Sequence, residues 1–296
     1  MRIIKQATKL LCVFSLAGMS MCVMHGRADQ KLAPAELVAK HLEAIGPAEA
    51  RARVSGMKIK GTCLLTVRQG GNGQVDGEAV MASQGSMNMI NMTFNSPDYP
   101  YESLKYDGKK FVASQFRPGL RTSLAQFFLT NEVLFKEGIV GGILSASWPL
   151  LNLQDKNPKL EYAGLRKVGG KQMHALKYMP RKGSDLKVTL FFDAETFQHV
   201  RSEYERTIYT TDQQRIPGGG GTLPTPSSPR SSNARINAFE EFADFKSEGG
   251  LNLPHTYRFE LSIQSEVRPA LVDWIFNLTD FTLNAQLDIG EFSERN

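Results

Sequence analysis

The sequence predicts an α+β protein built around an antiparallel β-sheet with one apolar face. Most segments after residue 54 alternate apolar and polar residues with a period of two, as half-buried strands do. Short glycine-containing turn signals separate these segments, and helical spacing of apolar residues occurs at only two places. We therefore expect about ten strands joined by short turns, without the alternation of strands and helices that builds a parallel sheet.

The chain begins with the pattern of a signal peptide. Three basic residues precede an uncharged run over 10–24, and Gly26 and Ala28 place small residues at the −3 and −1 positions of a cleavage site. The apolar run has about 15 residues, fewer than the ~20 that a membrane-spanning helix needs. We expect residues 1–28 to be removed on export, which leaves no transmembrane segment. The alternatives are an N-terminal anchor and lipid attachment at Cys22, although no small residue directly precedes this cysteine.

Removal of the leader changes the charge and the cysteine content. The leader holds four of the 35 basic residues and no acidic one, so 31 basic and 30 acidic residues remain. Because lysine and arginine do not cluster with aromatic residues, we expect no nucleic-acid partner. Cys12 and Cys22 also lie in the leader, so Cys63 has no intramolecular disulfide partner, and we expect it to be buried.

The first part of the remaining chain is predicted to pass from helix to strand. Residues 34–45 have apolar side chains at helical spacing and end at Gly46–Pro47, and a short helical turn is expected over 48–53. A long strand follows, apolar on one side and mostly polar on the other. The strands expected in this part are 55–68, 75–83, 87–94 and a hairpin over 104–116 that turns at Asp107–Gly108.

The middle of the chain, residues 123–148, is apolar and has few turn signals. Its apolar residues recur at roughly helical intervals, which predicts one or two helices with a break at Gly141–Gly142. Glycine at Gly138, Gly141 and Gly142 indicates a segment that is either mobile or tightly packed.

Strands resume after Pro158. A hairpin turn is expected at Gly169–Gly170, and residues 211–235 are rich in proline, glycine and serine, which is typical of a flexible insertion. The strands expected in this part are 159–168, 172–179, 186–193, 199–208, 236–245, 255–264 and 273–283.

No local motif for catalysis or metal binding is present. The sequence contains no G-x-S-x-G, H-E-x-x-H, C-x-x-C or G-x-x-x-x-G-K-[ST], and the histidines after the leader lie in distant segments. His41 and His255 lie on apolar faces and are interpreted as core residues. Glu240 and Glu241 could form an acid pair, but neighbours on a strand face opposite sides, so we interpret them as a solvated edge. We therefore expect no enzyme activity, no metal and no cofactor.

The order of these segments resembles the periplasmic lipoprotein-carrier superfamily of LolA/LolB type, the outer-membrane lipoprotein-sorting proteins. The resemblance implies an unclosed half-barrel with helices over its concave apolar face, a periplasmic location, and a single domain over 29–296 in which the insertion is a departure from the family. It also implies that residues 123–148 form a lid over a cavity for acyl chains. The resemblance is carried by residues 35–42, 54–67, 105–111, 123–148, 242–245, 250–255 and 280–284.

The leading hypothesis is a monomeric, non-enzymatic protein that binds an acyl chain or another lipid between sheet and lid, with envelope proteins or lipoproteins as further partners. The alternatives are an interaction or envelope-sensing protein with a filled core, and a hydrolase whose site no local motif reveals. The predicted apolar ligand-binding residues are Met57, Ile59, Leu65, Phe127, Phe128, Leu134, Phe135, Ile139, Ile143, Trp148, Tyr257 and Phe259.

Overall fold

The computed structural model describes residues 32–71, 73–115, 118–182, 184–210, 232–265 and 269–293. The described residues from Leu32 onward belong to one compact unit. The predicted signal peptide with Cys22, and residues 211–231 of the predicted insertion, lie outside the described residues. None of the described helices is both long and apolar enough to span a membrane.

One antiparallel sheet of twelve strands forms the protein, in the order β5-β4-β3-β2-β1-β12-β11-β10-β9-β8-β7-β6. The prediction of about ten strands was too low. The strands are β1 (Gly56–Gln69), β2 (Gly73–Gln84), β3 (Met87–Phe94), β4 (Tyr101–Tyr106), β5 (Phe111–Ala113), β6 (Lys159–Val168), β7 (Lys171–Met179), β8 (Lys187–Asp193), β9 (His199–Thr210), β10 (Ser232–Glu248), β11 (Leu251–Gln264) and β12 (Ala270–Leu283).

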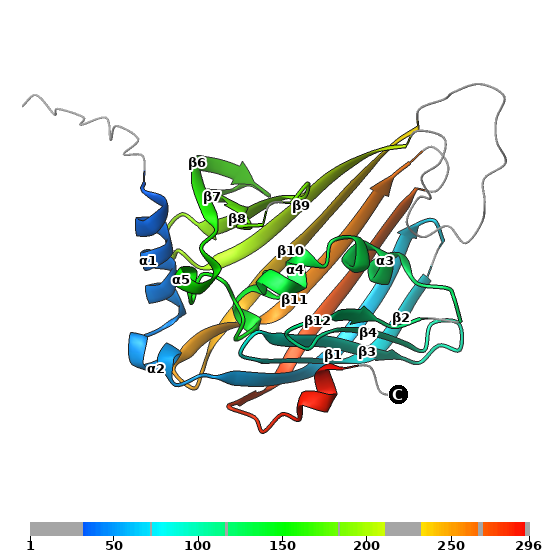
Figure 1. Cartoon of the computed structure of the whole chain (residues 1–296), viewed down its shortest axis with the longest axis horizontal. Helices are drawn as coiled ribbons and strands as arrows, with labels where there is room; N and C mark the ends of the chain where they lie inside the picture. The colour runs from blue at the N-terminus through cyan, green and yellow to red at the C-terminus, as the bar shows by residue number, and fades with distance from the viewer. Residues whose placement is uncertain are drawn as a thin grey trace, which may run out of the picture. The chain divides into compact units, whose positions relative to one another are not determined.

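The topology determines where the middle of the chain must run. β1 pairs with β12, which joins the two ends of the sequence at the centre of the sheet, and β5 and β6 are left as its two edges. Because β5 and β6 follow one another in the sequence, the chain between them must cross from one edge to the other. Its described residues from 118 to 158 do so over the concave face of the curved sheet (Figure 1).

The crossing segment is a chain of short helices rather than the one or two longer helices predicted. Glycines with positive φ interrupt it: Gly138 at 77°, Gly141 at 80° and Gly142 at 51°. At its start, the Thr122 side chain accepts a hydrogen bond from the Ala125 backbone N–H at 3.0 Å and caps the first helix. The segment contains α3 (Ser123–Thr130), α4 (Val133–Glu137), the 3-10 turn η1 (Gly142–Leu144) and α5 (Leu153–Lys156).

The remaining helices lie near the ends of the described chain. α1 (Pro34–Ile45) has the predicted bounds, and it buries Leu37, Val38, His41 and Ile45. The short helix α2 (Ala48–Ala52) follows it, and the 3-10 turn η2 (Ile289–Phe292) ends the described chain. β10 begins at Ser232, so the end of the predicted insertion is strand.

The two faces of the sheet differ in chemistry, as the period-two alternation predicts. On the convex face, Arg258 Nη2 lies 2.6 Å from Asp273 Oδ1, and Arg68 Nε lies 2.7 Å from Asp273 Oδ2. Arg201 and Arg258 both pair with Glu241. This network links β9, β10, β11, β12 and β1 across the solvent side, whereas the concave face is covered by the crossing segment.

Candidate ligand-binding site

The predicted sheet residues share the concave face. Met57, Ile59 and Leu65 come from β1, and Tyr257 and Phe259 come from β11; they are 6% exposed or less. β12 lies between these two strands, so the residues from β1 and β11 flank its inward-facing side chains. The structure thus brings the five residues into one apolar cluster.

The predicted residues of the crossing segment pack onto this face. We call residues 122–151 the lid segment. The ring centroid of Phe259 lies 5.2 Å from that of Phe128 and 6.0 Å from that of Phe127, and Phe128 contacts Phe135 at 5.1 Å. The lid residues predicted to bind ligand are all 2% exposed or less: Phe127, Phe128, Leu134, Phe135, Ile139, Ile143 and Trp148.

Polar side chains on β2 and β3 form hydrogen bonds with one side of the lid segment. The Ser83 Oγ on β2 accepts a hydrogen bond from the Ala146 N–H at 2.8 Å. The Asn88 Nδ2 on β3 donates to the Phe135 carbonyl at 3.1 Å and to the Ser147 Oγ at 3.3 Å. These contacts end on backbone groups of the lid segment as well as on a side chain, so they fix its position.

The opposite side of the lid segment is held from β9 and β7. The Arg206 Nη1 donates to the Asn131 Oδ1 at 3.1 Å and to the Thr130 carbonyl at 3.4 Å, at the end of α3. The Tyr178 hydroxyl donates to the Glu137 Oε2 at 2.9 Å, at the end of α4. Strands from both halves of the sheet therefore contribute polar contacts to the lid segment.

Glu240 on β10 is the most deeply buried of these polar groups. Its Oε1 accepts hydrogen bonds from the Gly141 N–H at 2.7 Å and from the Tyr257 hydroxyl at 2.7 Å, and its Oε2 accepts one from Tyr204. Burial raises the pKa of Glu240, and these donors oppose the shift. Glu240 and Glu241 do face opposite sides, but the interpretation as a solvated edge was wrong for Glu240, because β10 pairs on both sides and points it under the lid segment.

Near the end of the lid segment, Trp148 contacts a histidine of α1. The Trp148 Nε1–H donates to the His41 Nε2 at 3.2 Å, and the His41 Nδ1 lies 3.1 Å from the Phe197 carbonyl. His41 must therefore be neutral, with its proton on Nδ1. Burial lowers the pKa of His41 to about 4. His199 stacks on Trp148 at 4.8 Å, and burial lowers its pKa well below the usual value.

Glu102 on β4 joins the sheet to the start of the lid segment. Its Oε2 accepts hydrogen bonds from the Thr122 Oγ1 at 2.7 Å and from the Tyr99 hydroxyl. Burial raises the pKa of Glu102 to about 7, although both hydrogen bonds favour the ionised form. The cap of α3 therefore rests on a carboxyl that titrates near neutral pH.

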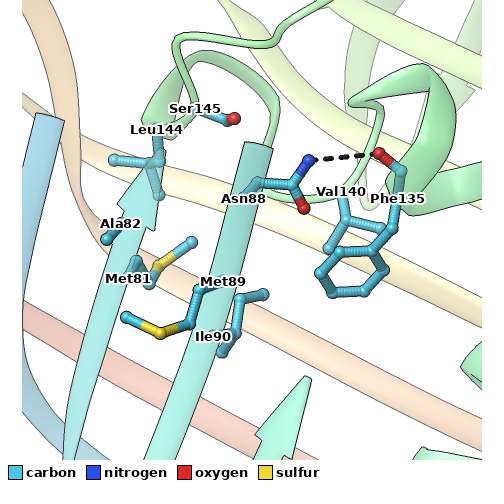
Figure 2. Close-up of a pocket in the computed structure, with 9 residues that line it drawn as sticks. All are labelled: Met81, Ala82, Asn88, Met89, Ile90, Phe135, Val140, Leu144 and Ser145. Atoms are coloured by element: carbon cyan, nitrogen blue, oxygen red, sulfur yellow. Dashed lines mark hydrogen bonds between the residues drawn. The ribbon is translucent and has the colours of Figure 1, made fainter. Parts of the chain in front are cut away.

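The structure describes a small pocket between the sheet and the lid segment. Figure 2 shows a pocket between β2, β3 and the lid segment, and its volume is about 10 Å³. That volume is enough for one water molecule, whereas pockets for small molecules measure roughly 300–1,000 Å³. This pocket therefore has no room for a lipid, and the apolar residues of the concave face and the lid segment named above are buried. The lining residues are Met81, Ala82, Asn88, Met89, Ile90, Phe135, Val140, Leu144 and Ser145.

The cysteine and two of the histidines after the leader were predicted to be core residues. Cys63 is a free, buried cysteine, as predicted. His41 is a core residue, whereas His255 is only partly buried and lies 3.2 Å from Glu248. In the described part of the chain, no three His, Cys, Asp or Glu side chains come together in a way that could hold a metal ion.

The sequence analysis missed the polar residues that hold the lid segment. Asn88, Glu102, Glu240 and Arg206 all occupy inward-facing positions of their strands, between apolar neighbours. A polar residue at an inward position of an otherwise apolar face is unusual, because its burial is costly unless it is hydrogen-bonded. The alternation of each strand could have revealed these inward-facing polar residues. It could not have revealed their hydrogen-bond partners, which lie in distant segments.

The fold and the site define a class of protein in which an unclosed antiparallel sheet carries an apolar concave face under a cover of short helices. No family model and no curated protein matches the sequence. Solved structures similar to the chain include a DUF1329 family protein from Desulfovibrio piger (10% identity, TM-score 0.44, covering 88% of this chain and 97% of the other). A LolA superfamily protein from Nitrosomonas europaea is similar over the same shares of both chains (9% identity, TM-score 0.45).

A third similar structure is an outer membrane lipoprotein-sorting protein domain from Vibrio parahaemolyticus (13% identity, TM-score 0.40, covering 86% of this chain and 97% of the other). The low identities and TM-scores describe a general layout, so we infer function from the residues of this chain.

Proposed function

We propose that the chain is an exported, periplasmic, non-enzymatic protein that binds an acyl chain or another lipid between the concave face and the lid segment. One observation carries the proposal: the cover of a large apolar face contributes no strand to the twelve-stranded sheet. Short helices and glycines form it, and hydrogen bonds from both sides hold it. It can therefore lift while the ladder of backbone hydrogen bonds beneath it stays intact.

The closed state follows from the same residues. Lifting the lid segment without a ligand would expose the apolar rings of Phe127, Phe128 and Phe135 together with Phe259. Burial of apolar surface is worth about 25 cal/mol per Å², so the empty protein favours the closed state. A ligand that covers the same surface offsets the cost of opening. The closed lid segment is thus the resting state that a carrier of this design would have.

One serine–histidine contact has the spacing of a hydrolase pair. The Ser202 Oγ lies 3.1 Å from the His199 Nε2, but both side chains are 1% exposed or less. The ring of His199 packs between Trp148 and Phe242. A nucleophile needs access to its substrate and a histidine that can accept a proton. Burial in an aromatic cluster favours a structural role for this pair.

Uptake of lipid by the purified protein tests the proposal. Trp148 lies in the lid segment and Trp274 on the sheet, and the sequence has no other tryptophan. In Trp274→Phe protein, the emission of Trp148 reports on the lid segment alone. We expect a neutral lipid such as palmitamide or methyl palmitate to change this emission, and a solvent extract of the purified protein to contain a lipid.

A matched pair of variants on β3 sharpens the test. Asn88→Ala removes the hydrogen bonds to Phe135 and Ser147, whereas Asn91→Ala changes the same residue type on the convex face, where Asn91 contacts Ser103. We expect faster lipid uptake by Asn88→Ala and the wild-type rate for Asn91→Ala. Equal rates for the two variants would contradict the role of the lid segment.

The second candidate function is an interaction or envelope-sensing protein with a permanently filled core. The small volume of the pocket, about 10 Å³, favours it. In that case neither the wild type nor Asn88→Ala would take up lipid, the extract would be empty, and the emission of Trp148 would not respond to lipid.

A further inference from the structure

Glu240 is a hydrogen-bond acceptor on the apolar concave face of the sheet. It is fully buried, and its recorded hydrogen-bond partners are the neutral donors Gly141, Tyr204, Tyr257 and Ser202, with no lysine or arginine among them. A buried carboxyl without a cation is a costly way to stabilise a fold, and replacement of buried ionic groups by apolar residues is often neutral or stabilising. The position of Glu240 therefore suggests a role beyond stability.

The donors of Glu240 belong to two different parts of the protein. Tyr204 lies on β9 and Tyr257 on β11, the two strands beside β10, so both hydroxyls stay in place when the lid segment moves. The Gly141 N–H belongs to the lid segment, between α4 and η1. Lifting the lid segment therefore removes one donor from Oε1 and leaves an oriented acceptor facing the opened space.

We propose that Glu240, oriented by Tyr204 and Tyr257, binds an N–H donor of the lipid ligand in place of the Gly141 N–H. The inference rests on the proposed function, since it requires the lid segment to open. The ligand class is an amide- or amine-bearing lipid, such as an N-acyl compound, with its apolar chain along Phe259 and its N–H at Glu240.

The chemistry of the site selects against other lipid classes. A fatty acid or a phosphate head group would bring a negative charge toward the Glu240 carboxyl, with no cation among its recorded partners to offset the repulsion. An ester has acceptors but no donor, so the Glu240 Oε1 would keep the Tyr257 hydroxyl but lack the second donor that Gly141 supplied. The loss of one of two hydrogen bonds at a buried carboxyl oxygen costs free energy, which makes a missing N–H a basis for discrimination.

Two ligands of matched chain length test the inference. Palmitamide carries an N–H donor and methyl palmitate carries none, and both are neutral. Binding of each is measured by the emission of Trp148 in Trp274→Phe protein, and then in the same protein with Glu240→Leu. Glu102→Gln serves as the matched control, because Glu102 is a second buried carboxyl at the lid segment but contacts Thr122 rather than Gly141.

We expect palmitamide to bind about tenfold more tightly than methyl palmitate, the ratio that corresponds to about 1.4 kcal/mol. Glu240→Leu should remove this preference, and Glu102→Gln should keep it. Equal binding of the two ligands by the Trp274→Phe protein overturns the inference and leaves the proposed function standing. Binding of neither ligand overturns both. If Glu240→Leu does not fold, Tyr257→Phe replaces it and should reduce the preference, because it removes a hydroxyl that orients the carboxyl.

Discussion

Protonation of His41 should weaken the attachment of the lid segment at acidic pH. His41 is neutral in the fold because burial lowers its pKa to about 4; the nearby Arg51 also lowers it, while the hydrogen bond to the Phe197 carbonyl raises it. In the unfolded chain the pKa is about 6.5. The stabilising contribution of neutral His41 is therefore fully present above about pH 6.5, and it is lost as the pH falls toward about 4.

The magnitude follows from the two pKa values. Between about pH 7.5 and about pH 4.5, the wild type should lose about 2.5 kcal/mol of unfolding free energy through His41 alone, at about 1.36 kcal/mol per pKa unit. Other buried groups titrate too: His199 acts in the same direction, while Glu102 and Glu240 act in the opposite one. A difference between two variants is needed to separate them.

His41→Gln supplies that difference. Glutamine has a carbonyl that can accept from the Trp148 Nε1–H and an amide that can donate to the Phe197 carbonyl, but it does not titrate. Urea unfolding of both proteins across this pH range should show the wild type losing stability relative to His41→Gln as the pH falls. A stability difference that is constant with pH would refute the assignment. Protonated His41 also loses its acceptor at Nε2, so the emission of Trp148 should shift to the red before global unfolding.

Three further predictions concern single side chains of the concave face. Glu240→Gln keeps an acceptor for the Gly141 N–H but does not titrate. Because burial raises the pKa of Glu240, the wild type loses unfolding free energy as the pH rises and the carboxyl ionises, so urea unfolding should show this variant gaining stability relative to wild type with increasing pH. Cys63 is 1% exposed and burial raises the pKa of its thiol, so a thiol reagent should label it slowly in the native protein and faster in Asn88→Ala. Phe259→Ala should lower the unfolding free energy by about 3–5 kcal/mol, measured in urea, because the ring is buried against the lid segment; a loss below about 1 kcal/mol would contradict the packing described above.

Local patterns predicted most of the fold. The alternation over 55–68 predicted β1, Asp107–Gly108 marked the turn between β4 and β5, and the helical spacing over 34–45 predicted α1 with its bounds. These features depend on neighbours within a few residues. The lid helices are shorter than predicted because the chain leaves the helix at Asn131 as well as at the glycines. Asn131 has φ −122°, and its Nδ2 donates to the Phe127 carbonyl at 2.8 Å, which apolar spacing does not reveal.

The site could be predicted only in part, because its polar contacts join distant segments. The apolar residues of the strands and of residues 123–148 predicted the concave face and the lid segment. The Glu240–Gly141 contact, however, spans 99 residues of sequence and the Trp148–His41 contact spans 107. Glu240 could be assigned to a face from the alternation, but not to a central strand, since strand order is a property of the whole chain. The pairing of β1 with β12 is likewise invisible in local sequence.

The polar contacts of the lid segment give its closed state a defined position and a defined free energy. Apolar packing is non-directional, so rings such as Phe127 and Phe128 would tolerate many placements on the concave face. Asn88 donates a hydrogen bond to the Phe135 carbonyl and Glu240 accepts one from the Gly141 N–H, and these contacts with the backbone of the lid segment allow one placement. A ligand that binds the open state must supply the free energy of opening, so its apparent affinity falls by the fraction of protein that is open. Each 1.4 kcal/mol removed from these contacts should raise the apparent affinity about tenfold until the open state predominates. The strength of the polar contacts, rather than the apolar area alone, would then determine how readily the protein takes up and releases its cargo.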